Sequence, residues 1–165
     1  LERSGLAPRY LEIELTESQA TNDAESFADM LIELKELGIS IAIDDFGTGY
    51  SSLGSLKNFP VDKVKINQSF TRDIVTEPDD SAIVQAVIAM SHHLQLRVVA
   101  KGVETERQAG FLRHCRCDSA QGFLFGAPVQ ASAFKNLLDT PGEKPRSARS
   151  PARGRMQRLP GASAS

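Results

Sequence analysis

The sequence predicts an α/β fold built on a parallel sheet, and two observations lead to this prediction. Short apolar runs alternate with longer amphipathic segments through residues 1–139, and each run comes directly before a helical segment. Such alternation is typical of β–α–β units, whose right-handed crossovers join parallel strands. Five units of this kind fit both a doubly wound sheet and a (β/α)₈ barrel. Because no G-x-G-x-x-G follows a strand, the dinucleotide-binding version of the doubly wound sheet is disfavoured.

The first strand–helix unit and the strand after it are the clearest part of this pattern. Apolar and polar side chains alternate in residues 10–15 (YLEIEL), as in a half-buried strand. Residues 23–37 repeat apolar side chains every three or four positions, which predicts a helix that Gly38 ends. The next run, residues 39–43 (ISIAI), is almost wholly apolar and predicts a buried strand.

The middle of the chain adds a short helix, a strand and a long helix. Residues 51–59 predict the short helix, and residues 61–66 (VDKVKI) predict the strand. Residues 79–94 predict the long helix, with Asp79 or Asp80 as its N-cap. One face of this helix is predicted to carry Ile83, Val87, Met90 and Leu94.

The last two units are shorter. Residues 97–100 (RVVA) predict a strand and residues 106–114 a helix. Residues 119–125 predict the last strand, and residues 132–138 predict the last helix. The expected α/β domain therefore spans residues 1–139.

Residues 140–165 are a different kind of sequence. They are rich in Pro, Gly, Ser, Ala and Arg, with six basic side chains and one acidic one. A segment with so little to bury is expected to be a disordered, solvated basic tail. Residues 1–139 instead hold 13 basic and 20 acidic side chains, a net charge of −7. An acidic body argues against a nucleic-acid polymer as partner and suits carboxylates gathered around a cation.

The chain begins at Leu1 rather than at a methionine, so we interpret it as a piece of a longer protein. No apolar run reaches the roughly 20 residues that a membrane span needs, and no signal-peptide pattern opens the chain. A cytoplasmic location is expected, with membrane attachment only through an upstream region. The two cysteines, Cys115 and Cys117, are too close for an unstrained disulfide and are interpreted as ordinary thiols.

Polar side chains follow the predicted strands at the end where parallel α/β folds hold their active sites. They are Glu14, Glu17, Asp44, Asp45, Lys65, Asn67, Lys101, Glu104 and Gln121. Adjacent carboxylates repel each other, so Asp44 and Asp45 at a buried strand end need a partner. A divalent cation would be one, since hard cations prefer oxygen ligands, and paired cations hydrolyse phosphate esters. The alternative is that one aspartate caps a helix and the other is solvated.

Five motifs, in this order, together resemble the EAL domain family, whose members hydrolyse cyclic di-GMP. They are LEIELTES, IAIDDFGTGYSSL, VDKVKIN, VVAKGVET and QGFLFGAP. The resemblance covers about residues 1–130 and implies an incomplete TIM-type (β/α) barrel, represented by about five C-terminal strand–helix units. It also implies a phosphodiesterase that converts cyclic di-GMP to linear pGpG in bacterial second-messenger signalling. Mg²⁺ or Mn²⁺ is the implied cofactor, with two cations in the complete domain.

The resemblance also implies roles for individual residues. Glu14 and Asp44 resemble metal ligands, and Asp45 resembles the residue that bridges to the second metal and the attacking water. Lys65 resembles the catalytic lysine that contacts the nucleophilic water or the phosphate. Glu17 resembles the acid that anchors the DDFGTG loop.

Two further residues, Glu104 and Gln121, resemble groups close to the reaction centre. Glu104 is the catalytic candidate and Gln121 the substrate-facing one. Both roles are implied by the resemblance.

Three departures from the family pattern concern the reaction directly. The chain begins downstream of the E-A-L segment and of an asparagine ligand, and the family's K-I-D ends here in Asn67. Where the family reads A-E-G-V-E, Lys101 replaces the first glutamate, a metal ligand and proposed general base. An ammonium at this position repels a divalent cation and is expected to empty the adjacent metal site. Lys101 is also a candidate to bind the substrate phosphate directly.

Four hypotheses stay open at this level. The chain is part of an EAL-type phosphodiesterase whose activity is impaired, or a degenerate EAL domain that binds cyclic di-GMP or a protein partner without hydrolysis. It is alternatively an enolase-like barrel with a lysine base, or a truncated product with no activity. Whether the chain is an enzyme is undecided. Open sheet edges make a homodimer a further expectation.

Overall fold

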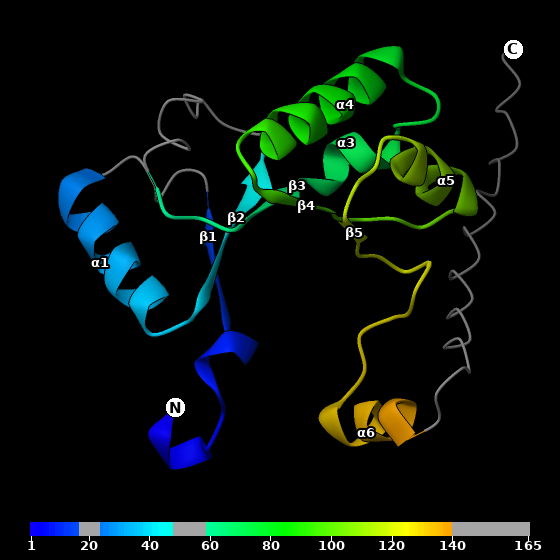
Figure 1. Cartoon of the computed structure of the whole chain (residues 1–165). Coiled ribbons are helices and arrows are strands. Elements are labelled where there is room, and N and C mark those ends of the chain that lie inside the picture. Colours follow the sequence, from blue (N-terminus) through cyan, green and yellow to red (C-terminus); the bar gives the residue numbers. More distant parts are fainter. Residues whose placement is uncertain (17–23, 48–58, 140–165) are drawn as a thin grey trace, which may run out of the picture. The chain divides into compact units, whose positions relative to one another are not determined.

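The computed structural model describes residues 1–16, 24–47 and 59–139. The chain divides into two units, Leu1–Phe125 and Gly126–Ser165, and the second is described only as far as residue 139. All the described strands lie in the first unit (Figure 1). The described part of the second unit contains helix α6 (Ala131–Asp139), close to the predicted helix at residues 132–138. The predicted tail, residues 140–165, lies outside the described residues.

The first unit is built on a parallel five-stranded sheet whose strand order follows the chain. Its strands are β1 (Glu12–Thr16), β2 (Ser40–Phe46), β3 (Lys63–Ile66), β4 (Arg97–Ala100) and β5 (Ser119–Ala120). Every neighbouring pair is parallel, which confirms the predicted fold class. A doubly wound sheet reverses its strand order at a switch point, whereas a (β/α) barrel keeps the order of the chain. The sheet therefore selects the barrel alternative.

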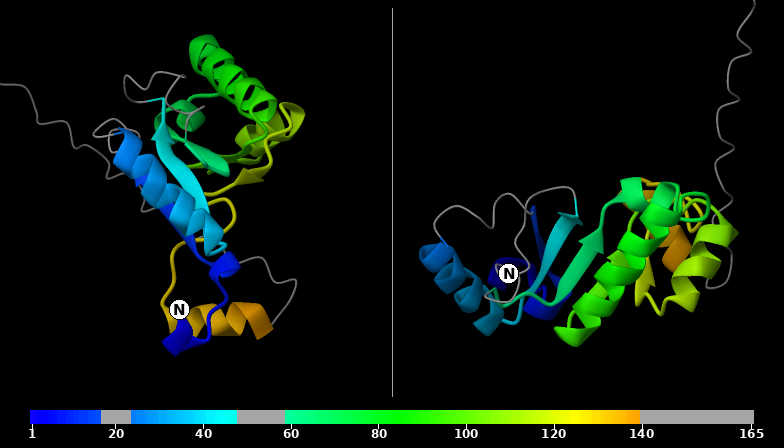
Figure 2. Two further views of the ribbon diagram at one scale, coloured as in Figure 1. Left: turned by 60° about the vertical axis from the view of Figure 1, so that its left-hand side comes forward. Right: turned by 90° about the horizontal axis from the view of Figure 1, so that it is seen from above.

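Helices join successive strands along one side of the sheet. Helix α1 (Ala24–Glu36) leads to β2, α4 (Pro78–His93) leads to β4, and α5 (Glu106–His114) leads to β5. Right-handed crossovers that all advance in one direction place their helices on the same face of a sheet. Figure 2 shows α1, α4 and α5 on that side. These three helices do not cover the opposite face of the sheet.

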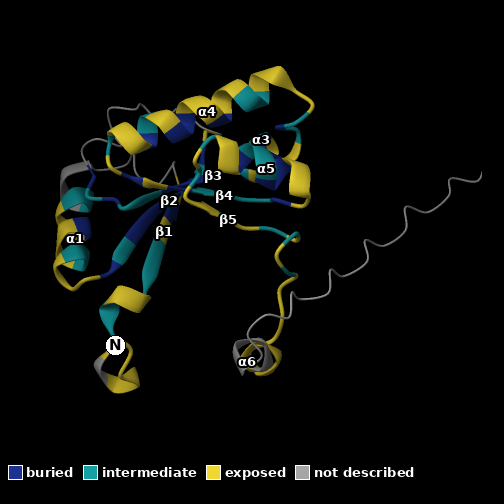
Figure 3. Cartoon of the chain, turned by 45° about the vertical axis from the view of Figure 1, so that its right-hand side comes forward, coloured by how far each residue is buried: buried dark blue, intermediate teal, exposed yellow. Residues whose placement is uncertain are grey.

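The core lies between the sheet and these helices. The fully buried side chains of Ile41, Val64 and Val98 come from three successive strands. They belong to one cluster with Leu31 of α1 and Val84 of α4. Figure 3 shows buried stretches on the strands and on α4. Side chains alternate between the two faces of a strand. The residues between these apolar positions therefore point away from the helices.

The first and last strands are shorter than the sequence predicts. A 3-10 helical turn, Pro8–Tyr10, takes the start of the first predicted strand, so β1 begins at Glu12. Strand β5 ends at Ala120 because the chain then turns onto the loop after β4. In that turn the Leu124 N–H donates to the Val103 carbonyl at 3.0 Å. Strand β4 and helix α5 have the predicted bounds.

Helix α4 begins differently from the prediction. Its N-cap is Glu77, with Pro78 in the first turn, and the Glu77 side chain makes no capping hydrogen bond. The prediction that Asp79 or Asp80 caps this helix is wrong, because Pro78 is already suited to the first helical position. The two aspartates lie in the first turn, where they complement the helix dipole.

The buried face of α4 is also rotated from the predicted one. It carries Val84, Val87, Ile88 and Ser91, whereas Ile83 is exposed. Of the predicted residues, Val87 is buried, and Met90 and Leu94 pack partly buried against the core. Apolar side chains cover much of the surface of this helix, so its sequence alone does not fix which side faces the core. Packing against the sheet decides it.

A short helix that the sequence analysis did not predict, α3 (Gln68–Arg72), follows β3. The predicted helix at residues 51–59 falls almost wholly outside the described residues. Within the part of the chain that the structure describes, no helix has the length and apolar character to cross a membrane.

Candidate functional site

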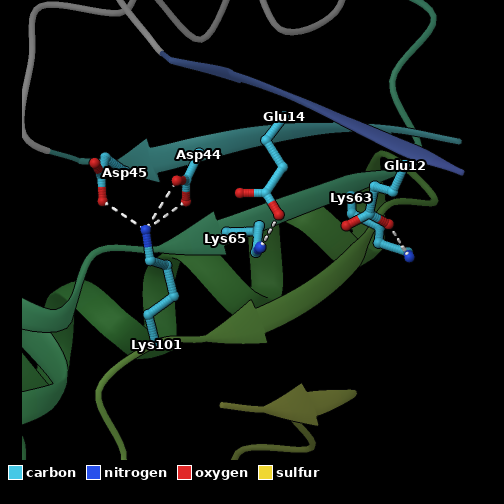
Figure 4. Close-up of polar contacts among 7 residues, drawn as sticks. All are labelled: Glu12, Glu14, Asp44, Asp45, Lys63, Lys65 and Lys101. Carbon is cyan, nitrogen blue, oxygen red and sulfur yellow. Dashed lines mark hydrogen bonds and ion pairs between the residues drawn. The ribbon is translucent and has the colours of Figure 1, made fainter. Parts of the chain in front are cut away.

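Charged side chains from neighbouring strands meet on the face of the sheet opposite the helices (Figure 4). Asp44 and Asp45 come from β2, Lys65 comes from β3, and Lys101 directly follows β4. Glu14 joins them from β1. These positions lie toward the carboxyl ends of the strands, where (β/α) barrels hold their active sites.

An irregularity in β2 explains how two adjacent aspartates serve one site. Between the pairs Ile43–Val64 and Phe46–Ile66, β2 contains one residue more than β3. Adjacent residues of a regular strand point to opposite faces, but Asp45 has a left-handed φ of 54°. A bulge of this kind redirects a side chain and is common beside active sites. Both carboxylates consequently reach the same cation.

That cation is the ammonium group of Lys101. Its Nζ donates to Asp44 Oδ1 at 2.8 Å, to Asp44 Oδ2 at 2.9 Å and to Asp45 Oδ1 at 3.0 Å. The Lys101 backbone N–H donates to the Ile66 carbonyl at 3.2 Å, which ties the residue to the end of β3. Charge-assisted hydrogen bonds of this length are about twice as strong as neutral ones. The lysine therefore supplies the partner that the adjacent aspartates require.

The environment keeps both Asp44 and Lys101 ionised. Burial alone would raise the pKa of Asp44, but the Lys101 hydrogen bond and the nearby positive charges outweigh it and lower that pKa. Burial likewise opposes the charge on Lys101, yet the hydrogen bonds to Asp44 and Asp45 raise the pKa of its ammonium. Each partner stabilises the charged form of the other. At neutral pH the contact is an ion pair rather than a shared proton.

Two further ion pairs extend along the same face. Lys65 donates to Glu14, and Lys63 donates to Glu12, so each lysine of β3 reaches across β2 to β1. Ala42 of β2 is paired in register with both Glu14 and Lys63. Its small side chain leaves room for the longer ones to meet above the middle strand. Lys65 is buried, which makes its carboxylate partner necessary.

Asn67, one of the polar residues expected at the strand ends, has two roles in the site. Its Nδ2 donates to Asp45 Oδ1 at 2.7 Å, while its Oδ1 accepts from the Ser69 N–H at 2.8 Å. The second contact makes Asn67 the N-cap of α3. Asn67 was expected at this end of the sheet, as a polar residue after a strand and as a departure from the family's K-I-D, but with no role in the site. The available signal was an N-cap residue placed directly after a strand.

A small cavity lies beside Asn67. Its volume is about 320 Å³, and its lining consists of Asn67, Gln68, Ser69, Arg72, Gly102 and Glu104. Gly102 has a φ of 73°, and a Cβ there would lie 2.6 Å from the Cβ of Gln68. Only glycine therefore permits this close approach between the end of β4 and α3. The cavity brings the predicted Glu104 to the same end of the sheet as Asn67.

Glu104 and Gln121 are both exposed. The Glu104 backbone N–H donates to Gln108 Oε1 at 2.8 Å, which fixes the loop that carries it. The Gln121 backbone N–H donates to the Ala100 carbonyl at 2.8 Å, directly before Lys101. Glu17, the predicted loop anchor, lies outside the described residues.

The metal ligands suggested by the resemblance are already engaged with lysines. Glu14 pairs with Lys65, and the two aspartates pair with Lys101. Among residues 1–16, 24–47 and 59–139, no three His, Cys, Asp or Glu side chains gather closely enough to hold a metal ion. The described donor set therefore does not fit a divalent cation while Lys101 occupies this position.

The cysteines lie elsewhere and take no part in this site. Both Cys115 and Cys117 are free thiols, and burial raises the pKa of each. A thiol with a raised pKa is a poor nucleophile at neutral pH. This agrees with their interpretation as ordinary thiols.

Comparisons with known proteins place the site in a family. The chain is 46% identical over 138 residues to the cyclic di-GMP phosphodiesterase NbdA of Pseudomonas aeruginosa, covering 84% of this chain and 18% of NbdA. It is 46% identical to the solved PaMucR phosphodiesterase in complex with c-di-GMP, with a TM-score of 0.77. That match covers 81% of this chain and 54% of the PaMucR chain.

A third relative is Klebsiella pneumoniae BlrP1, solved as a manganese and cyclic di-GMP complex. It is 38% identical with a TM-score of 0.72, over 78% of this chain and 33% of that one. The chain thus spans about a fifth of the length of the curated relative and about half or less of these solved chains. The EAL domain model matches residues 1–128, which include the whole of the sheet and the site on its polar face. This chain belongs to the EAL domain family.

Proposed function

We propose that this chain acts in cyclic di-GMP signalling as part of a phosphodiesterase-class domain that binds the nucleotide but hydrolyses it poorly. The observation that carries the proposal is the ammonium of Lys101 on both Asp44 and Asp45. A general base works best when its pKa lies near the working pH. Lys101 stands where the resemblance implies a glutamate that is both metal ligand and general base, and an ammonium can serve as neither.

Nucleotide binding is expected to survive this change. Cyclic di-GMP carries phosphodiester anions, and Lys101 and Lys65 both place ammonium groups on the polar face of the sheet. A lysine ammonium has three donors, so a phosphate oxygen can replace one of its carboxylate contacts. The cavity beside Asn67 provides further polar groups at the same end. The named activity of NbdA and the ligand of PaMucR support this choice of nucleotide.

We further propose that Mg²⁺ or Mn²⁺ serves the complete EAL domain but is excluded from the Asp44–Asp45 pair in this version of it. The manganese complex of BlrP1 supports a divalent cation in the family. In this chain, the positive charge of Lys101 and its hydrogen bonds to both aspartates oppose the binding of such a cation. A site that already holds a cation discriminates against a second one by direct repulsion.

A fully active phosphodiesterase is the second candidate, favoured by the identity of 46% to NbdA. The enolase-like alternative requires a lysine that gives up its proton near neutral pH. The raised pKa of Lys101 argues against that role for this residue. The free cysteines fit a reducing compartment, so we propose a cytoplasmic location. We also propose a homodimer that forms through the edge strands β1 and β5.

The decisive experiment compares Lys101 with Lys101→Glu in the full-length protein that carries this chain. Cyclic di-GMP turnover is followed by chromatography of the linear product, and binding is measured by calorimetry. The unmodified protein is expected to bind the nucleotide with little turnover. Lys101→Glu is expected to raise turnover with Mg²⁺ or Mn²⁺ by roughly 100-fold or more, the scale of a restored acid–base group.

Two further variants control this comparison. Lys101→Met removes the ammonium without adding a carboxylate, and it should recover less activity than Lys101→Glu. Arg113→Glu makes the same charge reversal on the exposed surface of α5 and should leave turnover unchanged. Equal turnover by the unmodified protein and Lys101→Glu would show that Lys101 does not limit hydrolysis. Absence of nucleotide binding in both would overturn the choice of ligand.

A further inference from the structure

Asn67 and Lys101 converge on the same carboxylate oxygen. Asp45 Oδ1 accepts from Lys101 Nζ at 3.0 Å and from Asn67 Nδ2 at 2.7 Å. Lys101 also spans both oxygens of Asp44. The bulge in β2 presents the two carboxylates together, and the ammonium and the amide approach them from the next two strand ends.

The amide of Asn67 is oriented by its other end. Its Oδ1 accepts from the Ser69 N–H and caps α3, so its Nδ2 is left to face Asp45. An aspartate at position 67 would keep the cap, because Asn and Asp cap helices about equally well. It would lose the donor and bring a third carboxylate to Asp44 and Asp45. Position 67 therefore controls whether this corner of the site holds two carboxylates or three.

We propose that Asn67 and Lys101 act as one unit that replaces a divalent cation at the Asp44–Asp45 pair, with Asn67 as its positioning residue. Lys101 supplies the positive charge, and Asn67 holds Asp45 in the orientation that the lysine uses. The proposal deepens the function proposed above, because it concerns the same site. Its test uses metal binding without nucleotide, so it succeeds or fails separately from the choice of cyclic di-GMP.

The unit predicts a specific coupling between two substitutions. With Lys101 present, a carboxylate at position 67 strengthens the internal ion pair and gains no metal. With Lys101→Glu, the ammonium is gone but the Asn67 amide still occupies Asp45 Oδ1. The double variant removes both, and it gathers enough oxygen ligands for a hard cation. The effect of Asn67→Asp should therefore depend on which residue stands at position 101.

The experiment is a Mn²⁺ titration by calorimetry of four full-length proteins: the unmodified one, Asn67→Asp, Lys101→Glu and the double variant. The first two are expected to bind no Mn²⁺ at the aspartate pair. Lys101→Glu should create a site, and Asn67→Asp on that background should tighten it by roughly 10-fold or more, the scale reported for groups that orient metal ligands. Circular dichroism checks that each variant keeps the helical content of the unmodified protein.

Control variants separate the contributions at the site. Asn67→Ser retains a capping oxygen but adds no charge, so with Lys101→Glu it should tighten Mn²⁺ binding less than Asn67→Asp. Gln85→Glu adds one charge on the exposed surface of α4 and should change nothing. Asp44→Asn in the double variant should abolish the gained binding if the metal lies where we place it.

Two results would overturn the proposal. If Lys101→Glu alone binds Mn²⁺ as tightly as the double variant, Asn67 plays no part in excluding the cation. If the unmodified protein binds Mn²⁺ at a site that Asp44→Asn removes, the lysine does not replace the metal. Neither result depends on whether the protein hydrolyses or binds cyclic di-GMP.

Discussion

Lys101 shows how one side chain sets the charge state of its neighbours. Its ammonium contacts both oxygens of Asp44, and the two side chains are 24% and 16% exposed. This burial is enough for the hydrogen bonds to prevail over solvent screening. The side chain of Asp45 is 43% exposed, so solvent weakens its ion pair with the same lysine more strongly.

The shifted pKa values predict how the Lys101 contact depends on pH. The pKa of Asp44 lies below its ordinary value of 3.8 in the folded protein, so its stabilisation is present above pH 3.8 and is lost as pH falls through the folded pKa. The pKa of Lys101 is raised above 10.5, so its stabilisation is present below pH 10.5 and is lost as pH rises through the folded pKa.

Lys101→Met is therefore expected to lower the free energy of unfolding by about 1.5–3 kcal/mol near neutral pH, the range for hydrogen bonds to charged groups. The difference from the unmodified protein should shrink as Asp44 becomes protonated. Denaturant unfolding of the full-length protein at pH 7 and pH 3 measures both values. A difference that stays constant across this range would contradict the assignment to Asp44.

At the scale of elements, Gln108 joins three segments that line the site. Its Oε1 accepts from the backbone N–H groups of Glu104 and Thr105, both at 2.8 Å. Its Nε2 donates to the carbonyls of Thr71 at 3.2 Å and Arg72 at 3.0 Å. The buried amide thus ties the last turn of α3 to the first turn of α5 and to the loop after β4.

Gln108→Leu is expected to destabilise the protein by roughly 2–4 kcal/mol, because it leaves several backbone groups without their partner. It should also weaken nucleotide binding, since the loop that carries Glu104 loses its anchor. Gln108→Glu keeps the acceptor but sets a carboxylate oxygen against the carbonyls of Thr71 and Arg72, so it should also destabilise the protein. Thermal unfolding and calorimetry of the full-length protein check these expectations.

Gln85→Ala on the exposed surface of α4 serves as the matched control and should be close to neutral. A Gln108→Leu protein as stable as this control would show that water replaces the lost hydrogen bonds. The hydrogen bonds of the Gln108 side chain would then have no measurable role in holding α3 against α5.

At the scale of the molecule, the two faces of the sheet differ in composition and in what they contact. One face is apolar and packs against α1 and α4, while the other carries the lysine–carboxylate pairs. Strands β1 and β5 each have only one neighbour among the described strands. A strand with an unpaired edge is a template for pairing with another chain.

Residues 1–165 expressed alone are therefore expected to associate or to unfold without a sharp transition. Denaturation followed by circular dichroism at several protein concentrations, with light scattering, tests this. Midpoints that shift with concentration would agree with edge pairing. A cooperative, concentration-independent transition of a monomer would contradict the prediction.

The repeat of short apolar runs and amphipathic segments was enough to predict a parallel α/β fold, because periodicity reports burial directly. The runs 97–100 and 106–114 became β4 and α5 with unchanged bounds. The motifs around Asp44, Lys65 and Lys101 also sufficed to predict the family. Local patterns of this kind depend mainly on residues close together in the chain.

Features that depend on contacts between distant residues were not predictable in this way. The bulge that turns Asp44 and Asp45 toward one cation arises from the pairing of β2 with β3. The second role of Asn67, as donor to Asp45 while it caps α3, joins positions 22 residues apart. The repulsion between Lys101 and a divalent cation was expected from its charge alone. Which oxygens the ammonium contacts was decided by the geometry of three neighbouring strand ends, since hydrogen bonds require distances and directions that a sequence does not contain.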